Sequence, residues 1–226
     1  MSEAESRYVV FDMDGTLIDS MPAHAAVFAT ILSTRFGLPV EGSRAHYHAT
    51  AGQPLDDQFR SAAASVAGGP VADLVEDFWT GVESEPVVPF PGTRDLLDEL
   101  RGRGKKLFVS SSCTTGVVRA KMASAGLTGR FELLLGAEYG HPRRTKGEDH
   151  FTEIAGHLRV PRDEFNRSGV MVGDAPHDVK VALEGGLTAV GLGHTEPQRA
   201  QLSAAGADFV IDEIGKLGAL LGPHPG

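Results

Sequence analysis

Short apolar segments, each bounded by turn residues, recur along the chain at the length of a β-strand. They contain few polar positions, which is typical of strands covered on both faces of a parallel sheet. We therefore expect strands at Tyr8 to Phe11, Lys106 to Val109, Phe131 to Leu135, Gly169 to Val172, Thr188 to Leu192 and Asp208 to Ile211.

Segments with apolar residues at helical spacing follow most of these runs. They are Thr93 to Arg103, Thr115 to Ala125, Glu148 to Leu158, Asp178 to Gly185 and Pro197 to Ala205. Strands that alternate with helices predict βα units, and such units build a parallel sheet with helices on its faces. The pattern thus favours a Rossmann-like α/β core.

One interval, from Pro22 to Val87, breaks the alternation because it contains helix-compatible segments and no strand pattern. These segments are Ala23 to Phe36, Leu55 to Val66 and Val71 to Glu83. The proline-rich stretch from Glu85 to Gly92 closes the interval, since its prolines end helices and stiffen the chain. We predict a small helical cap domain at residues 21–87, inserted into an α/β core domain of residues 1–20 and 88–226. The alternative is that these helices merely cover the sheet.

Composition narrows the possible partners. The chain has 226 residues and a formal net charge of -9, which argues against a general nucleic-acid binder, because such proteins carry clustered Lys and Arg. Its single cysteine cannot form an internal disulfide. The first ten residues lack the pattern of a signal peptide, and no segment approaches the roughly 20 apolar residues of a membrane span. We expect a cytoplasmic protein without nucleic-acid or membrane partners; its oligomeric state is not predicted.

The first apolar run ends in two carboxylates, Asp12 and Asp14, followed by Gly15. Residues two apart on a strand point the same way, and the carboxyl edge of a parallel sheet is where ligands bind. Two carboxylates at one place raise each other's pKa unless a cation lies between them. Oxygen ligands alone favour Mg²⁺. The alternative is an ordinary solvated turn.

Three more polar segments lie at this predicted edge or at the helix starts beyond it. Ser110 and Ser111 end one strand, Lys146 precedes a helix, and Asp174 with Asp178 follows another strand. Helix starts and strand ends of this kind bind anions. Each residue also has a simpler interpretation: Ser110 as a helix cap, Lys146 as a solvated charge, and Asp178 as a helix-start aspartate.

The ordered set of four motifs resembles the haloacid dehalogenase-like (HAD) hydrolases, and within them the capped phosphatases of the phosphoglycolate phosphatase and β-phosphoglucomutase group. The resemblance extends from about Tyr8 to Ile214. It implies that Asp12 is a nucleophile that forms an aspartyl-phosphate and that Asp14 is the general acid and base. Ser110 would hydrogen-bond a phosphoryl oxygen, and Lys146 would neutralise Asp12 and the phosphoryl charge.

The same resemblance implies the ligands of a magnesium ion and of a small phosphorylated metabolite, such as phosphoglycolate or a sugar phosphate. Mg²⁺ would be held by the carboxylate of Asp12, the backbone carbonyl of Asp14 and the carboxylate of Asp174, with Asp178 ordering a bound water. The predicted substrate-binding residues are Gly15, Thr16, Ser111 and His24.

Several rival functions remain open. A haloacid dehalogenase is disfavoured because relatives of that kind lack the second motif aspartate, and a phosphonatase because no lysine precedes Lys105. A sugar-phosphate mutase would use His24, but the predicted cap has Leu55 and its neighbours where mutases carry an arginine; otherwise His24 lies on a helix surface. A catalytically inactive binding protein of the same fold is a further alternative. The late Gly191-Leu192-Gly193 is a poor dinucleotide fingerprint.

Four features near the motifs have no settled role. Gly147 follows Lys146 where many relatives have a proline-containing turn, and Arg143 and Arg144 could reach a second anion or face solvent. Cys113 could make activity sensitive to oxidation or be a packed thiol. The histidines near these motifs show no ligand spacing: His141, His150 and His157.

Overall fold

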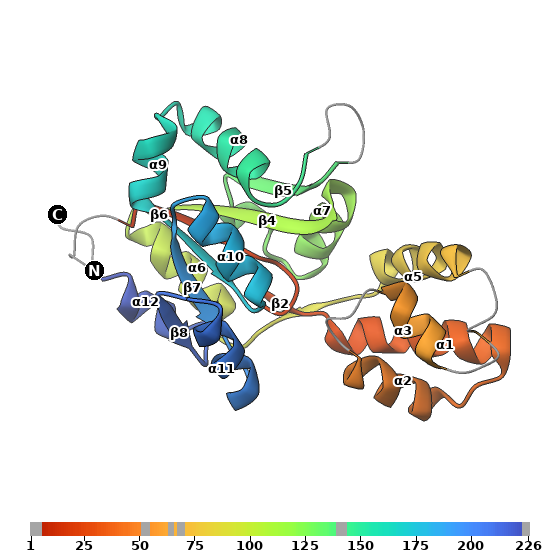
Figure 1. Ribbon diagram of the computed structural model, residues 1–226. Helices are drawn as coiled ribbons and strands as arrows, with labels where there is room; N and C mark the ends of the chain where they lie inside the picture. Colours follow the sequence, from red (N-terminus) through yellow and green to blue (C-terminus); the bar gives the residue numbers. More distant parts are fainter. Residues whose placement is uncertain (1–5, 51–54, 63–65, 67–70, 139–143, 223–226) are drawn as a thin grey trace. The chain divides into compact units, whose positions relative to one another are not determined.

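The computed structural model describes residues 6–50, 55–62, 66, 71–138 and 144–222, and the chain divides into two compact units (Figure 1). Residues 1–19 and 88–226 form an α/β unit, and residues 20–87 form a helical unit. Within the described ranges, no helix is both long and apolar enough to cross a membrane.

The α/β unit is built on a six-stranded sheet with the order β5-β4-β1-β6-β7-β8, and every pairing in it is parallel. This confirms the predicted α/β fold with a parallel sheet. The apolar first run lies in the middle, and its residues are fully covered because strands lie on both sides. The strands are β1 (Tyr8–Phe11), β4 (Lys106–Thr114), β5 (Leu133–Ala137), β6 (Gly169–Gly173), β7 (Thr188–Leu192) and β8 (Phe209–Ile211).

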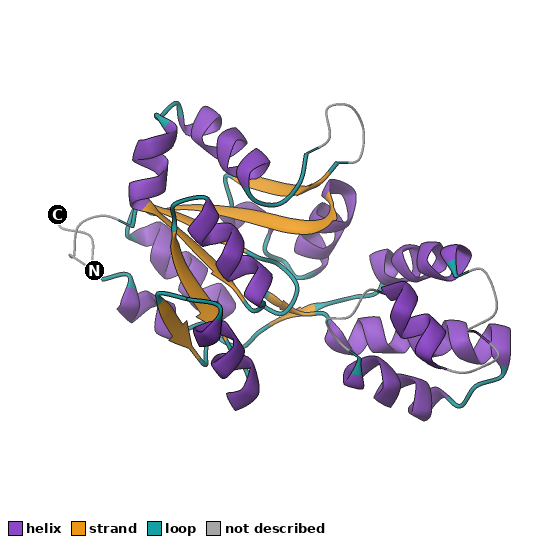
Figure 2. Ribbon diagram, viewed as in Figure 1, coloured by secondary structure: helices purple, strands orange, loops and turns teal. Residues whose placement is uncertain are grey.

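Helices flank this sheet (Figure 2). They are α6 (Thr93–Gly102), α7 (Thr115–Ser124), α8 (Glu148–Leu158), α9 (Arg162–Ser168), α10 (Pro176–Glu184), α11 (Glu196–Ala204) and α12 (Lys216–Leu220), with a 3₁₀ turn η1 (Thr128–Arg130). Threonine side chains cap the N-termini of two of these helices. The Thr114 side chain accepts from the N–H of Val117 at the start of α7, and the Thr195 side chain accepts from the N–H of Gln198 at the start of α11. The sequence pattern did not predict α9 or α12.

Packing between helices and sheet fixes the strand ends. One buried cluster joins strand residues, including Val10, Phe108 and Met171, to Phe151 and Ile154 of α8. Close packing leaves these side chains little freedom, so the polar residues that follow the strands start from rigid positions.

The helical unit contains α1 (Met21–Phe36), α2 (Val40–Ala49), α3 (Leu55–Ala62) and α5 (Ala72–Ser84). Its core contains several aromatic rings, and Phe59 packs against both Phe28 and Phe78. The helix α2 was missed because its start lies within "GLPVEG". There Gly37 ends α1 in the left-handed conformation, and Pro39 starts a new helix rather than a loop.

The two chain segments that connect the units pair as a short antiparallel ladder of β2 (Ile18–Asp19) and β3 (Val88–Pro89). That the helical unit acts as a cap over the α/β unit stays a prediction.

Candidate active site

The predicted site segments meet at the carboxyl edge of the sheet. Phe11 is in register with Val109 of β4 and Val172 of β6. The next residue, Asp12, therefore lies between Ser110 and Gly173, and its N–H donates to the carbonyl of Val172 over 2.8 Å.

Lys146 bridges two of the carboxylates. Its Nζ lies 2.5 Å from Asp12 Oδ1 and 2.5 Å from Asp178 Oδ1, and its side chain is only 6% exposed. The interpretation of Lys146 as a solvated charge is therefore wrong. Burial disfavours the ammonium, but Asp12 and Asp178 outweigh it and raise the pKa of Lys146 above its ordinary value. Gly147, with φ 107°, lets α8 start directly after the lysine.

Asp12, Asp174 and Asp178 form a carboxylate group in which one oxygen from each lies within 4.8 Å of the others. Burial, together with repulsion from Asp178 and Asp14, raises the pKa of Asp12 to about 7 against the opposing charge of Lys146. Burial and the charges of Asp12 and Asp178 raise the pKa of Asp174 to about 8. Three carboxylates facing one ammonium leave two negative charges uncompensated.

This group fits a hard divalent cation, since it offers only oxygen ligands and carries the charge that one dication would balance. Two glycines allow the close approach. A Cβ on Gly15 (φ 80°) would lie 2.3 Å from Asp174 Oδ2, and a Cβ on Gly173 would lie 2.3 Å from the Asp178 side chain. The Asp14 side chain does not belong to the group among the described residues, and the expected contact through its backbone carbonyl stays a prediction.

The side chain of Asp14 instead contacts a buried lysine and a thiol. Lys121 of α7 places its Nζ 3.1 Å from Asp14 Oδ1, and the Lys121 side chain is fully buried. The thiol of Cys113 donates to Asp14 Oδ2 over 3.3 Å. Burial, followed by the charge of Asp14, raises the pKa of Cys113 to about 12, which favours the packed thiol of the two alternatives.

Lys121 was not predicted, although the sequence carried a signal for it. It follows Val117 and Val118 at helical spacing and precedes Met122, and all four residues are buried. A lysine within the apolar stripe of an amphipathic helix is unusual, since buried charges need a partner.

The serines of β4 make local contacts. Ser110 does not cap the following helix, because Thr114 has that position; its Oγ lies 2.8 Å from Nδ1 of the buried His150. The hydroxyl of Ser111 accepts from the N–H of Cys113 over 3.1 Å. His150 was missed because its contact with Ser110 joins residues 40 positions apart.

Asp178 contacts the start of α10, as its helix-start interpretation predicted, and it also pairs with Lys146, which was not predicted. Its Oδ2 accepts from the N–H of Ala175 at the start of α10, while its Oδ1 pairs with Lys146.

The side chain of Gln198 donates to the carbonyl and carboxylate of Asp174 over 2.8 and 3.2 Å. The ring of His194 donates from Nε2 to the carbonyl of Gly15 over 2.7 Å. Neither Gln198 nor His194 was predicted.

Three of the predicted substrate-binding residues are buried: Ser111, Thr16 and His24. Thr16 is fully covered, and its Oγ1 has no hydrogen-bond partner in the described part of the chain. His24 belongs to the helical unit and is 9% exposed, with its ring against those of Tyr47, Phe78 and Trp79. The alternative of a helix-surface histidine is therefore wrong for His24.

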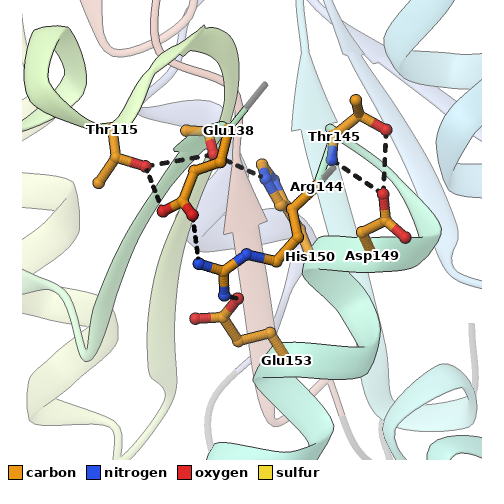
Figure 3. Close-up of polar contacts among 8 residues, drawn as sticks. Thr115, Glu138, Arg144, Thr145, Asp149, His150 and Glu153 are labelled. Atoms are coloured by element: carbon orange, nitrogen blue, oxygen red, sulfur yellow. Dashed lines mark hydrogen bonds and ion pairs between the residues drawn. The ribbon is translucent and has the colours of Figure 1, made fainter. Parts of the chain in front are cut away.

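The side chain of Arg144 is 39% exposed and contacts two carboxylates. It pairs with Glu138 at 2.5 Å and with Glu153 of α8 at 2.7 Å (Figure 3). These pairs join the segment before Lys146 to the end of β5 and to α8. Arg143 and His141 lie outside the described residues.

Comparison with known proteins places this geometry in a family. A family model described as haloacid dehalogenase-like hydrolase matches residues 9–192. "Probable phosphatase IndB" of Dickeya dadantii is 32% identical over 92% of this chain and 90% of its own length. "Phosphoglycolate phosphatase" of Caulobacter vibrioides is 27% identical over 90% of this chain and 85% of its own. A HAD family hydrolase from Deinococcus radiodurans, solved with bound phosphate and sodium, is 25% identical with a TM-score of 0.72, over 96% of this chain and 98% of its own. The chain therefore belongs to the haloacid dehalogenase-like hydrolases.

Proposed function

We propose that this hydrolase is a Mg²⁺-dependent phosphomonoesterase that acts through an aspartyl-phosphate on a small phosphorylated metabolite. The observation that carries the proposal is the bridge from Lys146 to Asp12 and Asp178, beside Asp174 at the carboxyl edge of the sheet. Two relatives described as phosphatases, and a related structure that holds phosphate, support it.

Asp12 is the nucleophile in this proposal. Its carboxylate attacks phosphorus while the bond to the leaving oxygen breaks, and the phosphoryl group is transferred to Asp12. Bound Mg²⁺ supplies charge that keeps the carboxylates ionised and neutralises phosphoryl oxygens. The residues that would hold it are Asp12 and Asp174 through their carboxylates and Asp14 through its carbonyl, with Asp178 placed for a bound water. Lys146 holds the Asp12 carboxylate in place and opposes the charge that collects there.

Asp14 gives a proton to the leaving oxygen and then takes one from the water that attacks phosphorus, while the bond from phosphorus to Asp12 breaks and phosphate is released. Ser110 donates to a phosphoryl oxygen, and backbone N–H groups of Gly15, Thr16 and Ser111 donate to the remaining phosphoryl oxygens. The substrate class is phosphoglycolate or a sugar phosphate of similar size. The relative described as a phosphoglycolate phosphatase favours the first.

A panel of phosphorylated metabolites, assayed with and without Mg²⁺, tests the proposal, with Asp12→Asn as the decisive variant. We expect phosphate release from at least one small monoester, its loss without the metal, and a fall of about 10⁴-fold or more in Asp12→Asn. Asp163→Asn is the matched control, because Asp163 is 70% exposed in an exposed ion pair. Release of phosphate by Asp12→Asn at the rate of the control would overturn the covalent mechanism.

The mutase alternative makes a different prediction for the same panel. A mutase converts one sugar phosphate into an isomer and releases little phosphate. His24, its expected base, packs among aromatic rings of the helical unit, and residues 51–54 of the segment compared with mutases lie outside the described residues. Isomerised sugar phosphate as the main product would favour the mutase.

A further inference from the structure

His150 is a buried histidine that takes no part in the chemistry proposed above. It lies on α8, and its ring joins two strands of the sheet. Nδ1 is 2.8 Å from Ser110 Oγ of β4, and Nε2 is 3.2 Å from the carbonyl oxygen of Gly136 in β5. Figure 3 shows this ring reaching from α8 toward the strands, close to Thr115, which donates to the same carbonyl oxygen.

These contacts have a fixed direction. A carbonyl oxygen only accepts, so Nε2 must carry the proton that points at Gly136. Burial lowers the pKa of His150, which favours the neutral ring. In a neutral ring with a proton on Nε2, Nδ1 is an acceptor, so the hydroxyl of Ser110 donates its only proton to His150.

A phosphoryl dianion at Ser110 would compete for that proton. Its oxygens only accept, and Ser110 has one proton to give. If the hydroxyl turned toward the oxyanion and nothing else changed, lone pairs of Oγ and Nδ1 would face each other across 2.8 Å in a buried place. An unpaired buried contact of this kind is costly, so a second change must accompany binding.

The charges around His150 permit that change. They are Asp149 and Glu153 on α8, Lys146 just before it, and Glu138 at the end of β5 with its partner Arg144. Asp149 and Glu153 favour a charged ring, whereas Lys146 opposes it. β4 presents the hydroxyl of Ser110 to His150, and α7 presents the hydroxyl of Thr115 and the charge of Arg119, which acts on Glu138.

We infer that His150 is a positioning residue for Ser110, and that an oxyanion binds at Ser110 together with one proton taken from solvent onto Nδ1 of His150. The O–H bond of Ser110 does not break: the hydroxyl turns its proton to the oxyanion, and Nδ1–H donates to Oγ in its place. This inference rests on the proposed function in placing the phosphoryl oxygen at Ser110.

Sulfate binding in saturating Mg²⁺ tests the inference, because sulfate remains a dianion that only accepts from about pH 6 to pH 8. If one proton enters with sulfate, affinity falls by up to about tenfold per pH unit above the pKa of His150. His150→Asn should remove this slope, because an amide donates at the position of Nδ1 without titrating. His157→Asn is the matched control on the same helix, since the His157 side chain is 40% exposed.

The expected result is a one-proton slope in the wild type and in His157→Asn that is absent from His150→Asn and Ser110→Ala. A full slope in His150→Asn, with sulfate binding weakened in Ser110→Ala, would overturn the inference and leave the proposed function standing. Unchanged sulfate affinity in Ser110→Ala would instead overturn the placement of the phosphoryl oxygen, and the inference with it.

A spectroscopic measurement on the wild type covers the case in which His150→Asn fails to fold. The side-chain ¹⁵N shifts of His150 should report a neutral ring protonated on Nε2 without sulfate, and a ring protonated on both nitrogens at saturating sulfate and Mg²⁺. A ring that stays neutral while sulfate occupies Ser110 would overturn the inference.

Discussion

Asp12 and Asp14 lie two residues apart in one turn, yet each faces a different buried lysine in different surroundings. The Asp12 side consists of Asp12, Asp174, Asp178 and Lys146, in which three carboxylates face one ammonium. The Asp14 side consists of Asp14, Lys121 and Cys113, in which one carboxylate faces one ammonium and a thiol donor. Among these described residues, the first side carries excess negative charge, whereas the second pairs one carboxylate with one ammonium.

This difference separates the two carboxylates chemically. The pKa of Asp12 is raised to about 7, so a cation must be added before Asp12 is a fully ionised nucleophile at neutral pH. Asp14 is held by groups of the protein, since Lys121 pairs with its Oδ1 and the thiol of Cys113 donates to its Oδ2. To serve as the general acid, Asp14 must be protonated before the leaving oxygen departs.

Asp14→Asn gives the largest effect that distinguishes the two sides. Loss of the general acid and base should lower kcat by about 10²–10⁴ on an alkyl phosphate. On p-nitrophenyl phosphate the loss of the acid matters less, because that leaving group needs no proton, so phosphorylated Asp12 should accumulate. Mass spectrometry of the quenched reaction measures the phosphoryl group on the peptide that contains Asp12. Equal losses on both substrates would contradict the acid role of Asp14.

The second-largest effect is expected on the free energy of unfolding when the metal is removed at pH 6 and at pH 8. Folding raises the pKa of Asp12 to about 7 and that of Asp174 to about 8, so their contribution to stability is complete below about pH 4 and is lost as pH rises through those values. Without metal, the free energy of unfolding should fall by about 3–4 kcal/mol between pH 6 and pH 8. Mg²⁺ should restore more stability at pH 8 than at pH 6, as measured by urea unfolding.

Asp174→Asn is the control for this pH dependence, because it removes one repelling carboxylate from the Asp12 side. Its metal-free stability should depend less on pH, and Mg²⁺ should stabilise it less. A variant whose stability follows the wild-type curve at every pH would contradict the charge excess described for this side.

Lys121→Met tests the Asp14 side. Removing a fully buried cation leaves the Asp14 carboxylate without that partner, which should cost about 1–2 kcal/mol of stability, since Asp14 keeps some access to water. Lys180→Met should cost almost nothing, because the Lys180 side chain is 68% exposed. In an Asp14→Asn background the cost of Lys121→Met should shrink, and a double-mutant cycle measures the difference. Additive costs would mean that the two side chains do not stabilise each other.

The parallel sheet could be predicted because strands covered on both faces leave uninterrupted apolar runs such as Val9 to Phe11. The helix α2 could not, because its start depends on how Gly37 and Pro39 together turn the chain. The strands β2 and β3 have two residues each, too few for any alternation to be visible.

The residues of the site also fall into those that the sequence could predict and those that it could not. Asp12, Ser110 and Asp174 could be predicted because each follows an apolar run, and parallel strands bring their carboxyl ends to one edge. His150 and Gln198 could not, because they reach the site from helices, and only the packing of those helices decides which side chain points to the sheet.

Substitution of Cys113 is expected to change activity least, and its thiol can be used as a chemical probe of the Asp14 side. It is the only cysteine, so a thiol reagent reports on it alone. With a pKa of about 12, caused by burial and then by the charge of Asp14, its thiolate fraction at pH 8 is about 10⁻⁴, and alkylation by iodoacetamide should be slow. Cys113→Ser should keep activity within about threefold, because a hydroxyl can donate the same hydrogen bond to Asp14.

In Asp14→Asn the charge is removed while the burial remains, so the alkylation rate of Cys113 should rise but stay below that of a free cysteine. Because burial is the larger cause of the raised pKa, a rate that reached the free-cysteine value would mean that the thiol is open to water rather than packed. No change at all would mean that the carboxylate of Asp14 is not the acceptor of its proton. The size of the rise therefore separates charge from burial on the Asp14 side.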